Sequence, residues 1–429
     1  MPRRGSTSRR RGGRCSKGPP APLLATLWQG LVPDWWCARH PSRWRRPNEW
    51  RSGCWSSRPG SGRRSRAGET STSPPHRPRV EYRGSDWTTL CAPGGRMRRL
   101  VSSVLGLAAA MPALGRTPPN LTAPMPETVA DPDRWLERRI EAEAGLGVWP
   151  QAMPRIHRNV EGKAQTAILF IHGWGACRAE GEHVVDQLAD EWNANVFYMR
   201  LPGHGRDAAA QRETQPAAYT RAVAEALNVA EALGETVVVV GTSTGGLLAT
   251  WVAGQYPDRV DAAVFASPFY DYSARWVGPV LNNRVTTALV RLAMGRERYA
   301  GWEGVEDRRD LPGYEDHWLI RQESMAMVQL EQLRRGIWAS SGFPGNVSQP
   351  VLLLHYYKDD DHKDSVISTD RLLQVYDRFN GGTSHPHSRR VPLVDGNHIL
   401  LSAYVRVEHT AVLDAMRDYF TDVLGAPNP

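Results

Sequence analysis

Residues 236–245 read Thr-Val-Val-Val-Val-Gly-Thr-Ser-Thr-Gly, an apolar β-branched run followed by Gly-x-Ser-x-Gly. Apolar residues with helical character follow at 246–251, so the stretch predicts a buried strand, a sharp turn and a helix. A Cβ at Gly241 or Gly245 would clash with the adjacent strand or helix. The turn lifts the Ser243 hydroxyl to the carboxyl edge of a sheet. We therefore interpret Ser243 as a candidate nucleophile; the alternative is a glycine-rich turn with an incidental serine.

The sequence around this turn predicts an α/β fold with a doubly wound, mostly parallel sheet. Its strands are apolar at nearly every position and alternate with helices, which implies a sheet covered on both faces. We assign this core to residues 131–272 and 350–429. The predicted strands are 166–171, 195–199, 236–240, 262–266, 351–355 and 389–392, and the predicted helices include 131–145, 219–233 and 407–424.

The alternation breaks between Ser273 and Gln349, where the sequence predicts several helices, including 281–294 and 314–338. We expect this insertion, residues 273–349, to form a helical cap over the carboxyl edge. Its aromatic and Met residues either line an acyl pocket or only join the cap helices to one another. They are Trp276, Trp302, Trp318, Met325, Met327 and Trp338.

A serine needs a base within hydrogen-bond reach and a third group that orients the base. His398 is the best candidate base, because it follows the last predicted strand and completes the chain order Ser…Asp…His. The acid should follow the strand at 351–355. Asp364 is favoured because its carboxylate can be held against the sheet edge, whereas Asp360 and Asp361 remain alternatives within the same acidic loop.

The oxyanion of a tetrahedral intermediate needs hydrogen-bond donors. One predicted donor is the backbone N–H of Thr244, at the start of the helix that follows Ser243. The second is the Trp174 N–H, in the loop His172-Gly173-Trp174-Gly175 after the strand that ends at Ile171. The alternative for this loop is a simple turn that ends the strand.

Five motifs occur in order: residues 170–175, residues 200–205 (Arg-Leu-Pro-Gly-His-Gly), the 241–245 turn, the acidic loop after 351–355, and Gly396-Asn397-His398. Together they resemble the α/β-hydrolase superfamily, most closely its capped lipase/esterase branch with monoacylglycerol-lipase-like and serine-aminopeptidase-like proteins. The resemblance covers about residues 155–425 and implies hydrolysis of carboxylic esters without a cofactor. The chain departs from the pattern after 351–355, where Tyr356-Tyr357-Lys358 replaces the usual glycine.

Residues 1–96 differ sharply in composition from the rest. They contain 19 Arg, 1 Lys and 5 acidic residues, a net charge of +15, whereas 97–429 carries 33 basic and 40 acidic residues, a net of −7. The segment shows no sustained period, so we expect it to be disordered. Four of the five cysteines lie in it without metal-ligand spacing, and Cys177 alone in the remainder suggests a small buried residue.

Residues 97–110 read like a signal peptide, with Met97-Arg98-Arg99 before a short apolar run. We expect Met97 to be the natural start and 1–96 to be a translated upstream stretch, with 97–130 an apolar segment and linker. The protein would then be exported or anchored to a membrane through residues 100–115, and otherwise cytoplasmic.

The sequence supports three hypotheses about function. The leading one is a serine hydrolase acting on a small acyl ester; an amidase, peptidase, thioesterase or carbon–carbon bond hydrolase would use the same triad. A non-catalytic hydrolase-like receptor is the alternative of another class. The sequence shows no metal cluster, phosphate loop or nucleotide fingerprint, so it predicts no cofactor, and no nucleic-acid partner is expected. It leaves the oligomeric state open.

Overall fold

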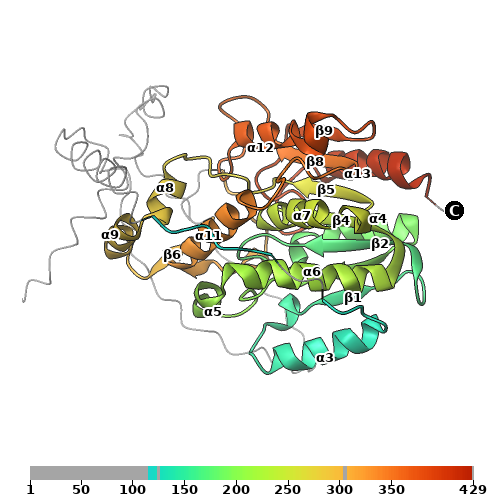
Figure 1. Ribbon diagram of the computed structural model, residues 1–429, viewed down its shortest axis with the longest axis horizontal. Coiled ribbons are helices and arrows are strands. Elements are labelled where there is room, and N and C mark those ends of the chain that lie inside the picture. The colour runs from blue at the N-terminus through green and yellow to red at the C-terminus, as the bar shows by residue number, and fades with distance from the viewer. Residues whose placement is uncertain (1–114, 123–125, 303–306, 428–429) are drawn as a thin grey trace, which may run out of the picture. The chain divides into compact units, whose positions relative to one another are not determined.

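The computed structural model describes residues 115–122, 126–302 and 307–427. In this part of the chain seven strands form one sheet in the order β1-β3-β2-β4-β5-β8-β9, parallel except for β1 against β3 (Figure 1). The fold is therefore the doubly wound, mostly parallel α/β fold predicted from the sequence. The strands are β1 Arg155–His157, β2 Ala164–Ile171, β3 Asn195–Tyr198, β4 Gly234–Thr242, β5 Ala262–Ala266, β8 Val351–Tyr356 and β9 Arg389–Leu393.

Helices cover both faces of this sheet, and the valines of β4 pack against helices on both faces. Val237 and Val239 pack into a core cluster with α6 (Pro216–Leu233) and α7 (Thr244–Gln255). Val238 and Val240 pack into a second cluster with α4 (Glu182–Trp192) and α13 (His409–Leu424). Alternate side chains of a strand point to opposite faces, so a strand covered on both sides is apolar throughout.

The other helices of the sheet domain begin where the sequence offers caps. α3 (Pro132–Ala144), which corresponds to the helix predicted over 131–145, starts after Asp131, whose side chain accepts a hydrogen bond from the Arg134 N–H at 2.9 Å. The short α5 (Ala208–Glu213) starts after Asp207, and α12 (Thr369–Tyr376) starts after Ser368 in the same way. Cys177 is buried at 1% exposure, as expected.

The segment between β5 and β8 contains helices and a two-stranded ribbon. Its elements are α8 Val277–Asn282, α9 Arg284–Met294, β6 Glu297–Tyr299, α10 Tyr314–His317, β7 Arg321–Glu323 and α11 Ala326–Trp338. The expected continuous helix over 314–338 is wrong, because residues 321–323 pair antiparallel with β6. The expected helix over 281–294 is interrupted at Asn283, which is extended and caps α9 with its side chain.

Sequence reasoning missed the edge strand β1, which has three half-buried residues and no apolar run. The described residues include no helix long and apolar enough to cross a membrane. The predicted disorder of 1–96 and the signal-like segment at 97–110 lie outside the described residues, as does the proposed membrane segment except for its last residue, Gly115.

Candidate active site

Ser243 occupies a strained turn between β4 and α7. Its backbone adopts φ 53° and ψ −115°, a conformation that costs a residue with a side chain about 1–3 kcal/mol. An added Cβ at Gly245 would lie 1.9 Å from the Ile171 carbonyl oxygen, and one at Gly241 would lie 2.4 Å from the Gly245 carbonyl oxygen. Close packing of strand against helix therefore requires both glycines, as the sequence predicts.

The structure brings Ser243, His398 and Asp364 together. Ser243 Oγ lies 2.8 Å from His398 Nε2, and His398 Nδ1 lies 2.8 Å from Asp364 Oδ2. A carboxylate only accepts, so Nδ1 carries the proton toward Asp364 and Nε2 is free to accept from the Ser243 hydroxyl. Ser243 is 7% exposed and Asp364 is 4% exposed. The three side chains form a hydrogen-bonded series although 155 residues separate the first from the last.

Of the four aspartates in the acidic loop, only Asp364 reaches His398. Its other carboxylate oxygen, Oδ1, accepts from the N–H groups of Val366 and Ile367 at 2.8 and 3.2 Å, which fixes the side chain against the edge of the sheet. The other three are exposed: Asp359 contacts His362, Asp360 contacts Lys363, and Asp361 points to solvent.

Two carboxylates act on the imidazole of His398. Burial lowers the pKa of His398, but the Asp364 charge and hydrogen bond raise it, and the charge of Glu180 raises it further. The net pKa is above the ordinary value of 6.5. The site therefore favours the imidazolium form that would arise when His398 takes a proton.

The two predicted donor amides lie on backbone next to Ser243. Thr244 is the first residue of α7, so its N–H has no acceptor within the helix. The loop that holds Trp174 runs against the serine, because a Cβ added at Gly173 would lie 3.1 Å from Ser243 Cβ. Among the described residues, no backbone acceptor is bonded to the Trp174 N–H.

Sequence reasoning missed Glu180, a buried carboxylate of this site. It is 2% exposed, and its carboxylate accepts a hydrogen bond from the Gly173 N–H. None of the ion pairs among the described residues includes it. Burial raises the pKa of Glu180 to about 7, although the Gly173 hydrogen bond and the His398 charge lower it. An acidic residue seven positions after Gly173 is the only trace of this contact in the sequence.

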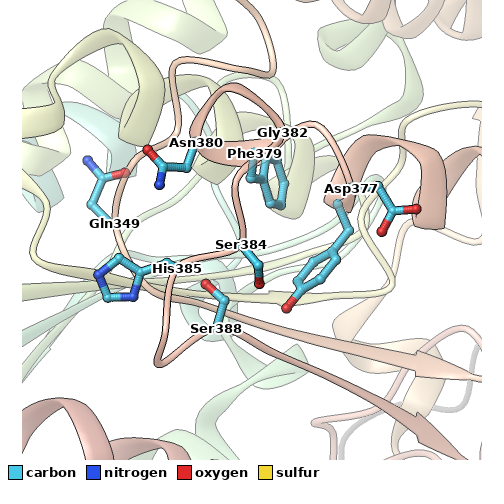
Figure 2. Close-up of a pocket in the computed structure, with 9 residues that line it drawn as sticks. Gln349, Asp377, Phe379, Asn380, Gly382, Ser384, His385 and Ser388 are labelled. Atoms are coloured by element: carbon cyan, nitrogen blue, oxygen red, sulfur yellow. The ribbon is translucent and has the colours of Figure 1, made fainter.

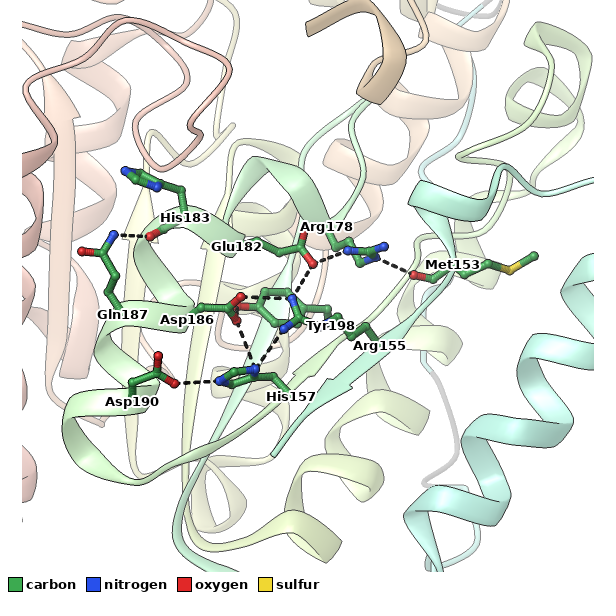
Figure 3. Close-up of polar contacts among 10 residues, drawn as sticks. All are labelled: Met153, Arg155, His157, Arg178, Glu182, His183, Asp186, Gln187, Asp190 and Tyr198. Carbon is green, nitrogen blue, oxygen red and sulfur yellow. Dashed lines mark hydrogen bonds and ion pairs between the residues drawn. The ribbon is translucent and has the colours of Figure 1, made fainter. Parts of the chain in front are cut away.

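Ion pairs hold the short turn η6 (Arg178–Glu180) that carries Glu180. Arg178 contacts both Glu182 and the Met153 carbonyl oxygen, the latter at 3.1 Å, and Arg155 binds Glu182 at 2.7 Å (Figure 3). Figure 3 also shows Asp186 bound by Arg155 and by the Tyr198 hydroxyl. This network joins β1, η6 and α4, and thereby sets where Glu180 enters the site.

A pocket at the opposite edge of the sheet is distinct from this site. It lies where β8 and β9 begin (Figure 2). Ser243, by contrast, lies where β4 ends. Ser388 Oγ in it accepts a hydrogen bond from the Val351 N–H, and His385 Nδ1 accepts one from the His387 N–H. The pocket is lined by Gln349, Tyr376, Asp377, Phe379, Asn380, Gly382, Ser384, His385 and Ser388. No paired serine and histidine is found among these residues.

Metal ligands do not cluster in the part of the chain that the structure describes: no three His, Cys, Asp or Glu side chains there lie close enough to hold an ion.

His172, a buried histidine next to the site, has a structural contact. His172 Nε2 accepts from the Leu201 N–H at 3.0 Å, and burial lowers the pKa of His172 to about 4. A neutral His172 thus ties the loop after β2 to the segment after β3.

The chain matches the model of the alpha/beta hydrolase family over residues 168–409. It is similar to pimeloyl-[acyl-carrier protein] methyl ester esterases: 32% identical over 125 residues to that of Vibrio cholerae serotype O1 (29% of this chain, 45% of that protein), and 27% over 129 residues to that of Pectobacterium carotovorum subsp. carotovorum (29% and 47%). The chain thus spans a little under half the length of these curated relatives.

One solved chain with a similar fold comes from LipS and LipT, two metagenome-derived lipolytic enzymes. It has a TM-score of 0.47 and 17% identity, and the match covers 64% of this chain and 99% of that chain.

Proposed function

The chain belongs to the alpha/beta hydrolase family, and from this premise we propose that it is a serine hydrolase that cleaves carboxylic esters through an acyl-enzyme on Ser243. One observation carries the proposal: the series from Ser243 through His398 to Asp364, with both contacts at 2.8 Å. A buried nucleophile, a base and an orienting acid are the groups that acyl transfer needs.

The reaction would proceed in two halves. Ser243 Oγ attacks the ester carbonyl carbon while its proton passes to His398 Nε2, and the N–H groups of Trp174 and Thr244 bind the oxyanion. The imidazolium then gives the proton to the leaving alcohol, and the acyl group stays on Ser243. A water molecule, deprotonated by His398, attacks the acyl carbon and releases the acid. Asp364 keeps the Nδ1 proton in place throughout.

We further propose that residues 273–349 act as a cap over this site, as in the lipase/esterase branch. The Leu319 N–H donates to the Gly175 carbonyl oxygen at 2.7 Å, so the insertion contacts the loop that holds the Trp174 amide. The substrate would be a small acyl ester bound between cap and core. The name of the curated relatives, methyl ester esterase, supports an ester as the bond cleaved.

Hydrolysis of a panel of p-nitrophenyl esters by the full chain and by Ser243→Ala tests the proposal. We expect turnover by the parent protein and none above background by the alanine variant. Activity that survives in Ser243→Ala would refute the serine mechanism. Parallel assays with anilides and thioesters distinguish an amidase or thioesterase from an esterase, and ligand binding without turnover by either protein would favour a receptor.

A further inference from the structure

Two of the buried polar atoms without a hydrogen-bond partner lie on segments that are linked to Ser243 through other residues. They are Nε of Arg298, on β6, and the hydroxyl of Tyr272, in the segment after β5. Tyr272 is 7% exposed, so its hydroxyl lies out of reach of bulk solvent. Buried polar groups are nearly always hydrogen-bonded, because leaving one unpaired costs about 1–3 kcal/mol. Two such groups on connected segments call for an explanation.

One path of contacts leads from Ser243 to Arg298 through the loop after β2. Gly173 in that loop lies against the Ser243 side chain. Two residues further on, a Cβ added at Gly175 would lie 2.5 Å from Gln322 Nε2. Gln322 pairs with Arg298 across the β6–β7 ribbon, and Arg298 Nη2 donates to Gln322 Oε1 at 2.5 Å. Gln322 therefore links Arg298 to the loop that holds the Trp174 amide.

A second path reaches Arg298 from the other side of Ser243. The Phe269 N–H donates to the Ser243 carbonyl oxygen at 2.9 Å, and the ring of Phe269 lies 4.8 Å from that of Tyr272. Burial raises the pKa of Tyr272 well above its ordinary value, and the charge of Arg298 is among the groups that oppose this rise. Both paths end on Arg298, which therefore lies between Gln322, the residue packed against Gly175, and Tyr272.

Arg298 lacks the carboxylate partner that its neighbours have. Arg296 pairs with Glu323 at 3.2 Å and Arg334 pairs with Glu331 at 2.9 Å, whereas none of the ion pairs among the described residues includes Arg298. Burial lowers the pKa of Arg298, and an arginine guanidinium nevertheless keeps its charge in proteins. A half-buried guanidinium without an anion is unfavourable, and a ligand that supplies the anion would remove the penalty.

We propose that Arg298 and Tyr272 form a subsite for an anionic group of the substrate, so that the enzyme prefers esters that carry a carboxylate or a phosphate. The subsite rests on the proposed ester hydrolysis at Ser243. Arg298 would bind the anion through charge-assisted hydrogen bonds and Tyr272 would donate its free hydroxyl. The scissile carbonyl would lie at Ser243 below, so the subsite would select the substrate without taking part in bond cleavage.

The test compares charged and neutral esters of matched length. On the acyl side, mono-p-nitrophenyl esters of dicarboxylic acids are compared with p-nitrophenyl esters of the corresponding monocarboxylic acids. On the alcohol side, butanoate esters of 4-hydroxybutanoate and of 4-hydroxybutyl phosphate are compared with butyl butanoate. We expect kcat/KM for at least one anionic ester to exceed that for its neutral counterpart by roughly 10- to 100-fold. The two alcohol arms separate carboxylate from phosphate.

Variants assign the preference to its residues. Arg298→Met should abolish the preference and leave hydrolysis of neutral esters, Arg298→Lys should retain part of it, and Tyr272→Phe should reduce it. Arg296→Met is the matched control, because that side chain lies directly before β6 and is 68% exposed, and the preference of this variant should equal that of the parent protein. The proposal would be overturned if the neutral ester had the higher kcat/KM in every comparison. It would also be overturned if Arg298→Met favoured anionic esters as strongly as the parent protein does.

Binding separates the subsite from the chemistry. Titration calorimetry of Ser243→Ala with the same intact esters should show tighter binding of the anionic member, and the difference should vanish in Ser243→Ala/Arg298→Met/Tyr272→Phe. If no ester is turned over but this difference is present, the proposed function fails while the anion subsite stands. Equal binding of charged and neutral esters would refute the anion subsite and leave the proposed ester hydrolysis unaffected.

Discussion

The Glu180 carboxylate accepts a hydrogen bond from the Gly173 N–H, on the loop that runs against Ser243. This contact links a buried charge to the position of the Trp174 amide one residue further along. The same charge raises the pKa of His398. Glu180 therefore has two separable effects on the site, one through the loop and one through the electrostatic field.

Replacement of Glu180 by Gln and by Ala separates these effects. Gln keeps a carbonyl oxygen for Gly173 but removes the charge, so the pKa of His398 should fall and the acid limb of kcat/KM should move to lower pH. Ala also removes the acceptor, which should lower kcat about tenfold as the loop loses its support. Profiles of kcat/KM against pH check both, with Glu161→Gln, at an exposed carboxylate outside this network, as control. An acid limb unmoved in Glu180→Gln would contradict the electrostatic effect.

Glu180 also predicts how stability depends on pH. Burial raises its pKa from 4.5 to about 7, so the folded protein binds this proton more tightly than the unfolded chain does. The stabilisation is complete below about pH 4.5 and is lost as pH rises toward 7, by up to about 3 kcal/mol. Relative to the parent protein, Glu180→Gln should gain free energy of unfolding at pH 8 and little at pH 5. Urea denaturation at both pH values measures this, and an equal difference at the two would refute it.

The sequence predicts what depends on local pattern and chain order. The strand before Ser243, the glycines around it and the order of Ser243, Asp364 and His398 are visible without coordinates, because turn sterics and triad chemistry restrict those residue types. Glu180 and Arg298 are not visible, since each looks like an ordinary charged residue until long-range packing buries Glu180 and half-buries Arg298. The ribbon that carries Arg298 was missed because each of its strands has only three residues.

Asp364 is predicted to be the acid of the triad, and its neighbours provide matched controls. Asp364→Asn should lower kcat about 10⁴-fold, because an amide favours the wrong tautomer of His398. Asp360→Asn and Asp361→Asn alter exposed side chains of the same loop and should keep nearly full activity. Steady-state kinetics of the three variants decides the assignment. A larger loss in either exposed variant would transfer the role to that residue.

Gly173→Ala should lower activity more than stability. The added Cβ would lie 3.1 Å from Ser243 Cβ and 3.0 Å from Glu180 Oε1, so the loop must shift by a few tenths of an ångström. Because donor geometry decides oxyanion binding, we expect kcat to fall at least tenfold with KM little changed. Gly145→Ala, where the nearest atom is 3.5 Å away, is the control and should behave like the parent protein. Unchanged kcat in Gly173→Ala would contradict a role for this loop.

Ser243 should hold its hydroxyl in place at the expense of stability. At an ordinary helical position such as Ala222, replacement by Gly should destabilise the protein by about 1 kcal/mol. At position 243 the order should reverse: Ser243→Gly should exceed Ser243→Ala in free energy of unfolding by about 1–2 kcal/mol, because glycine accepts φ 53° and ψ −115° without strain. Both variants should be inactive, and urea denaturation compares them with Ala222→Gly. If Ser243→Gly is the less stable of the two, the turn stores no strain, and the backbone at this position is not what holds the hydroxyl toward His398.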